Sequence, residues 1–145
     1  MPGRTFAIGD IHGCDHALEL LLSEIKVQPE DTVVSLGDAV DRGPCTKQVI
    51  DRLIKLRQQC NFIFIMGNQE EMLLDSIVGG EWLPTWMMHG GQEALASYGG
   101  KPEMIPEEHL DFLRTGANYF ETPRDIFVHA SLEPGVPLDQ QSPLV

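Results

Sequence analysis

The sequence has few basic residues. Its 145 residues include 10 Lys+Arg against 22 Asp+Glu, which gives a formal net charge of −12. This balance argues against a protein that coats nucleic-acid phosphates, because such affinity comes from Lys and Arg side chains that displace counterions. An acidic chain can still bind a phosphorylated substrate when metal cations neutralise some of its carboxylates.

Long apolar runs and paired cysteines are also missing. The longest apolar run, Phe62–Met66, is far shorter than the about 20 residues that a membrane helix needs. The N-terminal segment reaches Asp10 before the apolar region of a signal peptide could form. Three cysteines, an odd number without metal-type spacing, fit a reducing compartment better than a disulfide framework. We therefore expect a cytoplasmic protein without a membrane partner.

The length and composition fit one globular domain over residues 1–145. The chain is 42% apolar and 22% charged, which is typical of a folded protein and not of a disordered or fibrous one. No internal repeat, low-complexity segment or domain linker interrupts it. A chain of this length can bury a substantial core without disulfides.

The first half of the chain alternates between strand and helix patterns. Three short apolar runs predict buried strands at Thr5–Ile8, Thr32–Leu36 and Phe62–Met66. Helical spacing runs from Leu18 to Ile25, with Asp15 as the expected N-cap, and from Val49 to Leu56. Apolar strands joined by amphipathic helices predict a parallel sheet with right-handed crossovers.

The second half predicts helices followed by a hairpin. Helical turns are expected at Glu70–Ile77, Gln92–Tyr98 and Glu107–Arg114, separated by glycine pairs. Two short strands, Asn118–Glu121 and Ile126–Val128, are expected to pair as a hairpin. The proline-rich tail from Glu133 to Val145 has no periodicity and predicts a loop.

Each predicted strand ends in glycine followed by an oxygen-bearing side chain. The three residues are Asp10, Asp38 and Asn68, spaced 28 and 30 residues apart. One such dipeptide alone is most simply a turn. Three in register indicate a site, because ligands of open α/β sheets bind outside the carboxyl ends of the strands.

Further polar residues surround these three. His12 follows Asp10, Asp41 and Arg42 follow Asp38, and His129 ends a fourth apolar run. Carboxylate, imidazole and amide ligands favour Mn, Fe, Zn or Ni over Ca. Together they suffice for two ions if one carboxylate bridges them, and a metal pair is a recurring device for displacement at phosphorus. Arg42 suits a phosphate oxygen, because its planar fork donates two charge-assisted hydrogen bonds.

The motifs resemble a known family. Gly9–Gly13, Gly37–Gly43, Gly67–Glu70 and Val128–Ala130 are similar to the successive signatures of the calcineurin-like metallophosphoesterases. More narrowly, they resemble the phosphoprotein phosphatase branch, which includes bacterial serine/threonine phosphatases and symmetrical dinucleoside tetraphosphatases. The resemblance covers residues 5 to about 131. It implies an α/β fold, a four-layer α/β/β/α sandwich, with a cap-like segment at about 79–116.

The resemblance also implies a role for each site residue. Asp10 and His12 would bind the first metal, Asp38 would bridge, Asn68 and His129 would bind the second, Arg42 would bind phosphate and Asp41 would orient a general-acid histidine. Two divalent ions are implied, with Mn²⁺ expected and Fe, Zn and Ni as alternatives.

Gln69 departs from the family pattern, which has histidine there. A glutamine amide can donate a hydrogen bond but cannot supply a proton to the leaving group. We expect an intact metal site with a weakened chemical step, least impaired for aryl phosphates. Asp41, without its histidine partner, is expected to hydrogen-bond the Gln69 amide.

The C-terminal end departs as well. No histidine follows His129, although the family usually has a further metal ligand downstream. Only 16 residues remain after His129, so we expect the sandwich to be C-terminally truncated, or shortened with its exposed sheet edge covered by self-association.

The resemblance implies a metal-dependent phosphoesterase that hydrolyses phosphomonoesters by attack of a metal-bound hydroxide. A serine/threonine protein phosphatase is the first interpretation, with a phosphorylated protein or small phosphoester as substrate. A symmetrical dinucleoside tetraphosphate hydrolase is an alternative. A second alternative is a catalytically impaired protein that binds phosphate or metal, as Gln69 and the absent downstream histidine suggest.

Other histidines and aromatic residues have simpler interpretations. His89 is expected at the surface of the cap-like segment, although a substrate contact there stays open. His109 is expected on a solvated helix face. A local apolar cluster is expected from Trp82, Trp86, Met87 and Met88.

Overall fold

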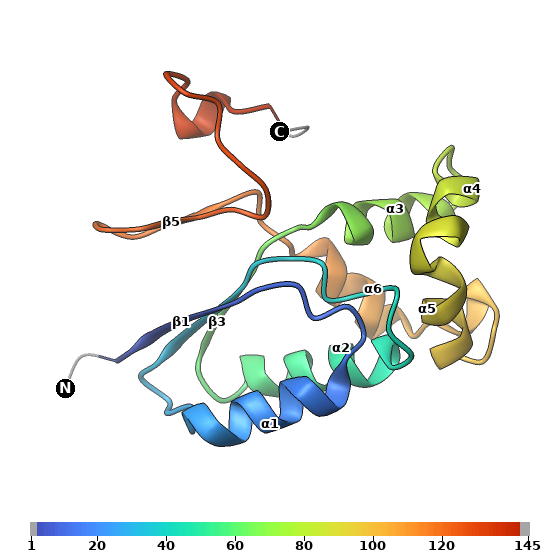
Figure 1. Cartoon of the computed structure of the whole chain (residues 1–145), viewed down its shortest axis with the longest axis horizontal. Helices are drawn as coiled ribbons and strands as arrows, with labels where there is room; N and C mark the ends of the chain where they lie inside the picture. The colour runs from blue at the N-terminus through green and yellow to red at the C-terminus, as the bar shows by residue number, and fades with distance from the viewer. Residues whose placement is uncertain (1–2, 143–145) are drawn as a thin grey trace.

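A parallel sheet forms the centre of the chain, which a computed structural model describes over residues 3–142 (Figure 1). Strands β1 (Thr5–Ile8), β2 (Thr32–Ser35) and β3 (Asn61–Phe64) lie side by side in that order. Phe6, Val33 and Phe62 share one register position across the sheet. The predicted parallel sheet is therefore confirmed.

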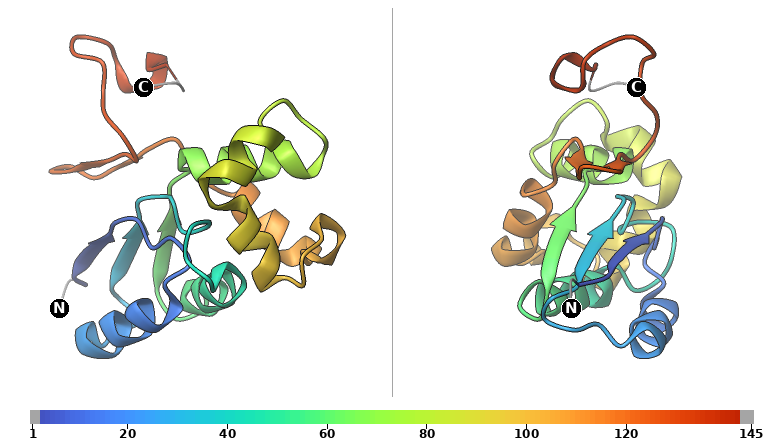
Figure 2. Two further views of the ribbon diagram at one scale, coloured as in Figure 1. Left: turned by 45° about the vertical axis from the view of Figure 1, so that its right-hand side comes forward. Right: turned by 90° about the vertical axis from the view of Figure 1, so that its left-hand side faces the viewer.

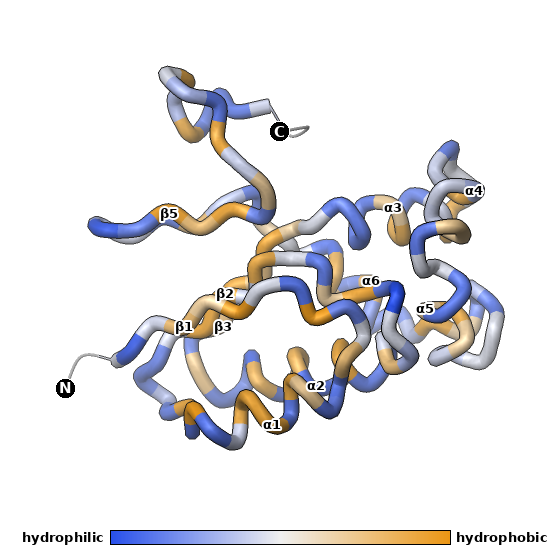
Figure 3. The backbone as a smooth tube through the Cα atoms, in the orientation of Figure 1, coloured by the Kyte–Doolittle hydropathy of each residue, from blue (hydrophilic) through white to orange (hydrophobic). Residues whose placement is uncertain are grey.

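Two crossover helices cover one face of this sheet. They are α1 (Asp15–Ile25) and α2 (Thr46–Arg57), which lie together below the strands in Figure 1. Helix α2 is the central packing element, because one of its sides is buried from Val49 to Leu56. Figure 3 shows apolar residues concentrated on the strands and recurring along both helices.

The N-terminus of α1 corrects one prediction. Asp15 is the first helical residue and Cys14 precedes it as the N-cap, without a side-chain capping hydrogen bond. The Asp15 carboxylate instead accepts two hydrogen bonds from Arg52 on α2, from Nε at 2.7 Å and from a terminal nitrogen at 3.0 Å. An ion pair between neighbouring helices has taken the side chain away from the helix end.

The second half of the chain is mostly helical and ends in a hairpin. Its elements are α3 (Asn68–Ile77), α4 (Leu83–Trp86), the turn η1 (Met87–Gly91), α5 (Gln92–Ser97), the 3₁₀ turn η2 (Pro102–Met104), α6 (Glu107–Arg114), β4 (Phe120–Glu121) and β5 (Ile126–Phe127). The expected helices and hairpin are confirmed, whereas Gly90 and Gly91 do not separate two helices with a loop but lie inside a kink.

The hairpin lies on the side of the parallel sheet opposite α1 and α2 (Figures 1 and 2). β4 and β5 pair in antiparallel fashion, and the rings of Phe120 and Phe127 stack with centroids 5.8 Å apart. Residues 3–142 thus supply a helical layer, the first sheet and a hairpin across from it. These are three successive layers of the expected α/β/β/α sandwich.

The tail is not a plain loop. Within the segment 133–145, which was predicted to be a loop, a 3₁₀ turn, η3, covers Leu138–Gln140. The last three positions of that segment, 143–145, lie outside the described residues. No helix within residues 3–142 is long and apolar enough to cross a bilayer.

Candidate metal centre

One side of the sheet collects the loops that follow the strands. Asp10 follows β1, Asp38 follows β2, Asn68 opens α3 after β3, and His129 lies just beyond β5. The ends of β1, β2 and β3 meet at one edge of the parallel sheet, and His129 reaches that edge from the separate hairpin, with its ring against Leu36 and Asn68. The structure therefore brings together residues that are up to 119 positions apart in the sequence.

A first group of donors contains Asp10, His12 and Asp38. One ligand atom from each lies within 4.8 Å of the other two. His12 Nε2 is 3.6 Å from Asp10 Oδ2 and 3.8 Å from Asp38 Oδ2. His12 Nδ1 lies 3.1 Å from the Val40 carbonyl, which can only accept, so Nδ1 carries the proton and the Nε2 lone pair faces the carboxylates.

A second group lies on the other oxygen of Asp38. His129 Nε2 is 3.5 Å from Asp38 Oδ1 and 3.0 Å from Asn68 Oδ1. His129 Nδ1 donates to the Leu36 carbonyl at 2.8 Å, which leaves Nε2 of the neutral ring as an acceptor. With the amide oxygen turned toward Nε2, as it is here, a cation between the two acceptor atoms would satisfy both of them. The donor set thus fits one cation on each side of the Asp38 carboxylate.

The backbone around these donors is strained. Four residues there have positive φ: 45° at His12, 51° at Asp38, 69° at Asp41 and 65° at Arg42. This is the left-handed region, which residues other than glycine adopt at a cost in free energy. Such strain concentrates at functional sites and persists only where surrounding contacts impose it. The site loops are therefore held by their neighbours and not by local preference.

Glu70 is one of the neighbours that hold the loop after β2 in this conformation. Its buried carboxylate accepts backbone N–H groups from Asp38 at 2.8 Å, Ala39 at 2.8 Å, Val40 at 3.2 Å and Gly67 at 2.9 Å. Burial, with the charge of Asp38, raises the pKa of Glu70 to about 7, while these donors act in the opposite direction. The sequence places Glu70 only at the start of a predicted helix and at the end of the third motif. Its place after Asn68 and Gln69 was the available signal for a larger role.

Asp41 and Gln69 do not form the expected hydrogen bond. Asp41 is fully buried, and its Oδ2 accepts the indole N–H of Trp86 at 2.8 Å. Asp41 Oδ1 and Gln69 Oε1 are buried without a hydrogen-bond partner within residues 3–142. The prediction was wrong: Trp86, from a segment far along the chain, donates to Oδ2, and Oδ1 does not accept the Gln69 amide. Gln69 is nevertheless at the site, since its backbone N–H donates to Asp38 Oδ1 at 3.1 Å.

The pKa of Asp41 is raised to about 8. Burial is the largest cause, and the negative charges of Glu70 and Asp38 add to it. The Trp86 hydrogen bond and the charge of Arg42 act in the opposite direction.

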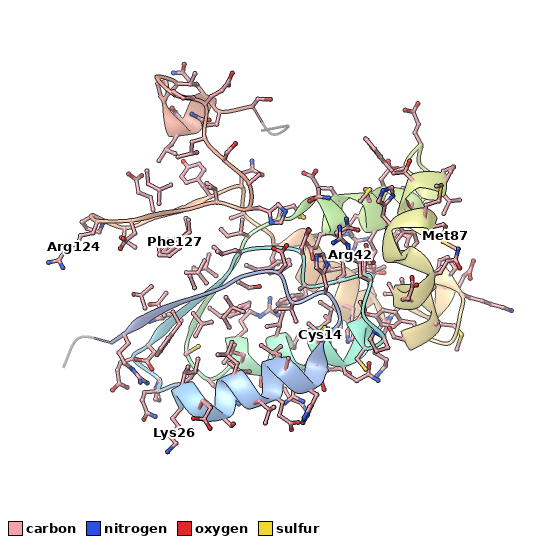
Figure 4. The ribbon with its side chains drawn as sticks, in the orientation of Figure 1. Cys14, Lys26, Arg42, Met87, Arg124 and Phe127 are labelled. Carbon is pink, nitrogen blue, oxygen red and sulfur yellow. The ribbon has the colours of Figure 1, made fainter. Side chains whose placement is uncertain are left out.

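Arg42 presents a free cationic head beside these groups. It is exposed, on the side of the sheet where the strands end (Figure 4). Its guanidinium has no hydrogen-bond or ion-pair partner within the described chain, although its backbone N–H donates to the Gly90 carbonyl at 3.3 Å. An unpaired guanidinium next to metal-type donors is suited to an incoming anion.

Two expectations away from the centre are corrected and one is confirmed. His109 is 3% exposed instead of solvated, because α6 packs on α2 and Asp51 and Tyr98 hydrogen-bond both ring nitrogens. The apolar cluster is only partly formed: Trp86 is fully buried, but Trp82 is 52% and Met88 is 82% exposed. His89 is at the surface, as expected.

A pocket of about 520 Å³ opens beside Asn68 and His129. Its apolar and aromatic walls include Met72, Trp82 and Tyr119. Its charged lining residues are acidic, namely Glu71 and Asp139. No Lys or Arg is among the described residues that line it.

An α/β sheet that gathers carboxylate, imidazole and amide donors at its strand ends agrees with the metal-dependent phosphoesterases, the class that the sequence motifs resemble. The family model described as calcineurin-like phosphoesterase matches residues 3–141, and the chain belongs to that family. The family uses divalent metal ions, and the group of Asp10, His12 and Asp38 provides a candidate for holding one.

The similar proteins are named for two different activities. The serine/threonine-protein phosphatase 1 of Salmonella typhimurium is 37% identical over 89 residues, which are 61% of this chain and 39% of that protein. The symmetrical bis(5'-nucleosyl)-tetraphosphatase of Erwinia tasmaniensis is 38% identical over 76 residues, covering 52% of this chain and 27% of that protein.

Among solved structures, a provisionally assigned diadenosine tetraphosphatase is similar over 98% of this chain, with 27% identity and a TM-score of 0.75. The matched region is 56% of that protein. The chain therefore spans between about a quarter and a little over half of the lengths of these three relatives.

Proposed function

We propose that this chain hydrolyses phosphomonoesters at a dinuclear metal centre, with phosphorylated protein as its substrate class. The observation that carries the proposal is that the two oxygens of the Asp38 carboxylate face different groups of ligands. Its Oδ2 faces His12 at 3.8 Å and its Oδ1 faces His129 at 3.5 Å. A carboxylate whose two oxygens face two donor sets in this way can bind one cation through each oxygen.

The two donor sets divide the metal ligands between them. Asp10 and His12 would hold one cation with Asp38, and Asn68 and His129 would hold the other. Two divalent cations bound there would supply Lewis-acid stabilisation of the phosphoryl oxygens and would lower the pKa of an attacking water. Mixed carboxylate, imidazole and amide donors favour Mn²⁺, Fe, Zn or Ni, and we propose Mn²⁺ as the first ion to test.

The chain's own side chains would bind the substrate and limit the leaving group. Arg42 would donate to phosphoryl oxygens through its unpaired guanidinium. Gln69 could donate a hydrogen bond to the departing oxygen but has no proton to transfer. General-acid assistance is worth about 10²–10⁴-fold, so substrates with acidic leaving groups are favoured over alkyl phosphates.

The pocket beside the centre favours a protein substrate over a dinucleoside polyphosphate. A tetraphosphate chain carries several negative charges, and outside the metal centre it would need Lys or Arg to neutralise them. The pocket instead offers Trp82, Tyr119 and Met72 with the acidic Glu71 and Asp139. Such walls suit an apolar or basic peptide segment.

A dinucleoside tetraphosphatase stays the second candidate. Its support is the activity for which the Erwinia tasmaniensis relative and the similar solved structure are named. An impaired phosphate-binding protein is the third, and its support is Gln69.

The test is Mn²⁺-dependent hydrolysis of p-nitrophenyl phosphate, with Asp38→Asn as the inactive control. We expect turnover that a chelator abolishes and that Asp38→Asn lacks. No turnover with retained phosphate binding would support the third candidate. Faster cleavage of a dinucleoside tetraphosphate than of a phosphopeptide would overturn the proposed substrate class in favour of the second.

A further inference from the structure

The segment Leu83–Gly91, formed by α4 and the kinked turn η1, contacts the site loop at two points. The indole N–H of Trp86 donates to Asp41 Oδ2 at 2.8 Å. One turn later, the Gly90 carbonyl accepts the backbone N–H of Arg42 at 3.3 Å. A side-chain contact and a main-chain contact thus hold two consecutive residues of the loop.

These two loop residues are the ones that need holding. Asp41 and Arg42 have φ of 69° and 65° in succession, and each costs energy for a residue with a side chain. On its other side the loop is held by Thr46 Oγ1, which accepts the Asp41 N–H at 3.0 Å, and by the His12 carbonyl, which accepts the Gly43 N–H at 2.9 Å. The segment 83–91 closes the remaining side.

The kink in η1 makes the double contact possible. His89 and Gly90 leave helical backbone angles there, and Gly90 has φ of 116°. A Cβ at Gly90 would collide with the backbone nitrogen of Arg42, so only glycine allows this approach. The kink redirects the chain so that Trp86 and the Gly90 carbonyl both meet the loop.

The polar atom of Trp86 matters separately from its bulk. The ring is fully buried and packs in the core, which any large aromatic side chain could do. Within residues 3–142, however, the indole N–H is the one hydrogen-bond donor to the Asp41 carboxylate. A buried carboxylate that lost this donor would be free to turn, and the loop would lose one of its restraints.

We infer that Trp86, together with Gly90, is a positioning device for phosphate binding: it acts through Asp41 to hold Arg42 in the strained conformation that directs the guanidinium to the phosphoryl group. The inference rests on the proposed function, in which Arg42 binds phosphate. Trp86 itself touches no substrate, so it is a positioning residue.

The test compares Trp86→Phe with Tyr98→Phe in the Mn²⁺-loaded chain. Trp86→Phe keeps a ring but removes the N–H, whereas Tyr98→Phe removes a buried hydrogen bond of the same helical region, made to His109 at 2.8 Å and not to the loop. The readout is the affinity for inorganic phosphate by calorimetry, alongside thermal stability. We expect affinity about tenfold weaker in Trp86→Phe, less than twofold weaker in Tyr98→Phe, and Mn²⁺ binding unchanged in both.

A double-mutant cycle shows whether Trp86 acts through Arg42. In an Arg42→Ala background, Trp86→Phe should weaken phosphate binding no further, because the group that it positions is gone. An equal additional loss in that background would overturn the inference, as would equal effects of Trp86→Phe and Tyr98→Phe. If Trp86→Phe does not fold, Gly90→Ala takes its place and is expected to weaken phosphate binding similarly, while unchanged affinity would contradict the inference.

The outcomes separate this inference from the function on which it rests. A chain that neither binds phosphate nor hydrolyses p-nitrophenyl phosphate with Mn²⁺ would refute both. A chain that does both, but whose phosphate affinity does not respond specifically to Trp86, would refute the positioning role alone.

Discussion

In the proposed function, Gln69 would determine which leaving groups the centre can release. It is buried beside Asp38, with its backbone N–H on Asp38 Oδ1 at 3.1 Å, so a side chain at this position lies next to the proposed metals. An amide cannot protonate an alkoxide. The proposed chemical step would then depend on the acidity of the leaving group.

Gln69→His should restore a proton donor. We expect kcat for a phosphoserine peptide to rise about 10²-fold, with little change for p-nitrophenyl phosphate, whose leaving group needs no proton. The measurement is a pair of kcat values for each protein at neutral pH. If the unsubstituted chain already cleaved phosphoserine as fast as the variant, the weakened step would be disproved.

Asp41 should make stability depend on pH. Its pKa is raised to about 8, first by burial, whereas an aspartate in the unfolded chain titrates near 4. Between these values the folded chain holds a proton that the unfolded chain releases, so the free energy of unfolding falls as pH rises. Asparagine does not titrate. As pH rises without metal, the free energy of unfolding of Asp41→Asn should therefore increase relative to that of the parent chain, by at most about 1.4 kcal/mol for each pH unit.

Urea unfolding from pH 5 to pH 8 in the presence of a chelator measures this difference. Asparagine keeps an oxygen that can accept the Trp86 N–H, so the packing is matched. Parallel stability curves for the two proteins would show that Asp41 does not carry the proton.

Some candidate site residues could be predicted from the sequence and others could not. The strand-end pattern found Asp10, Asp38 and Asn68, because a residue that directly follows a parallel strand has its place set by local chain geometry. Glu70 and Trp86 were missed as site residues, because their roles depend on contacts with residues 38–41 that lie 30 to 45 positions away. No local pattern encodes such pairings.

Three helical segments meet at His109. Its Nδ1 accepts the Tyr98 hydroxyl at 2.8 Å, and its Nε2 lies 2.8 Å from Asp51 Oδ1 on α2. The Asp51 carboxylate can only accept, so Nε2 carries a proton and donates to it, and Nδ1 of the neutral ring accepts the Tyr98 hydroxyl. This buried network joins α2, the end of α5 and α6.

His109→Leu should therefore destabilise the helical packing without touching the metal centre. It leaves the Tyr98 hydroxyl buried and unpaired, which costs about 1–3 kcal/mol. Urea unfolding measures the loss, and Mn²⁺ affinity is expected to stay the same. A loss below about 0.5 kcal/mol would be typical of a surface position and would contradict the structural role.

The prediction of helices and strands succeeded where periodicity was strong. β1 and α6 have the expected bounds, and β2, β3 and α2 differ by one to a few residues. The kink at η1 could not be foreseen, because it depends on how closely Gly90 approaches Arg42. The solvated face expected for His109 was wrong for a similar reason, since only the packed helices reveal its partners.

The chain as a whole gathers its donors from positions 10 to 129. Ions that bind this folded arrangement and not the unfolded chain stabilise it by mass action. They would also neutralise part of the −12 charge, at Asp10 and Asp38. The proposed function therefore requires one property of the entire molecule, namely that it holds two cations around a shared carboxylate.

Counting bound Mn²⁺ by equilibrium dialysis tests this property most directly. We expect about two ions for each unsubstituted chain, about one for Asn68→Ala, which loses a ligand on one side of Asp38, and fewer than one for Asp38→Asn, which loses the bridge. No retained Mn²⁺ in the unsubstituted chain, or two ions retained by Asp38→Asn, would contradict it.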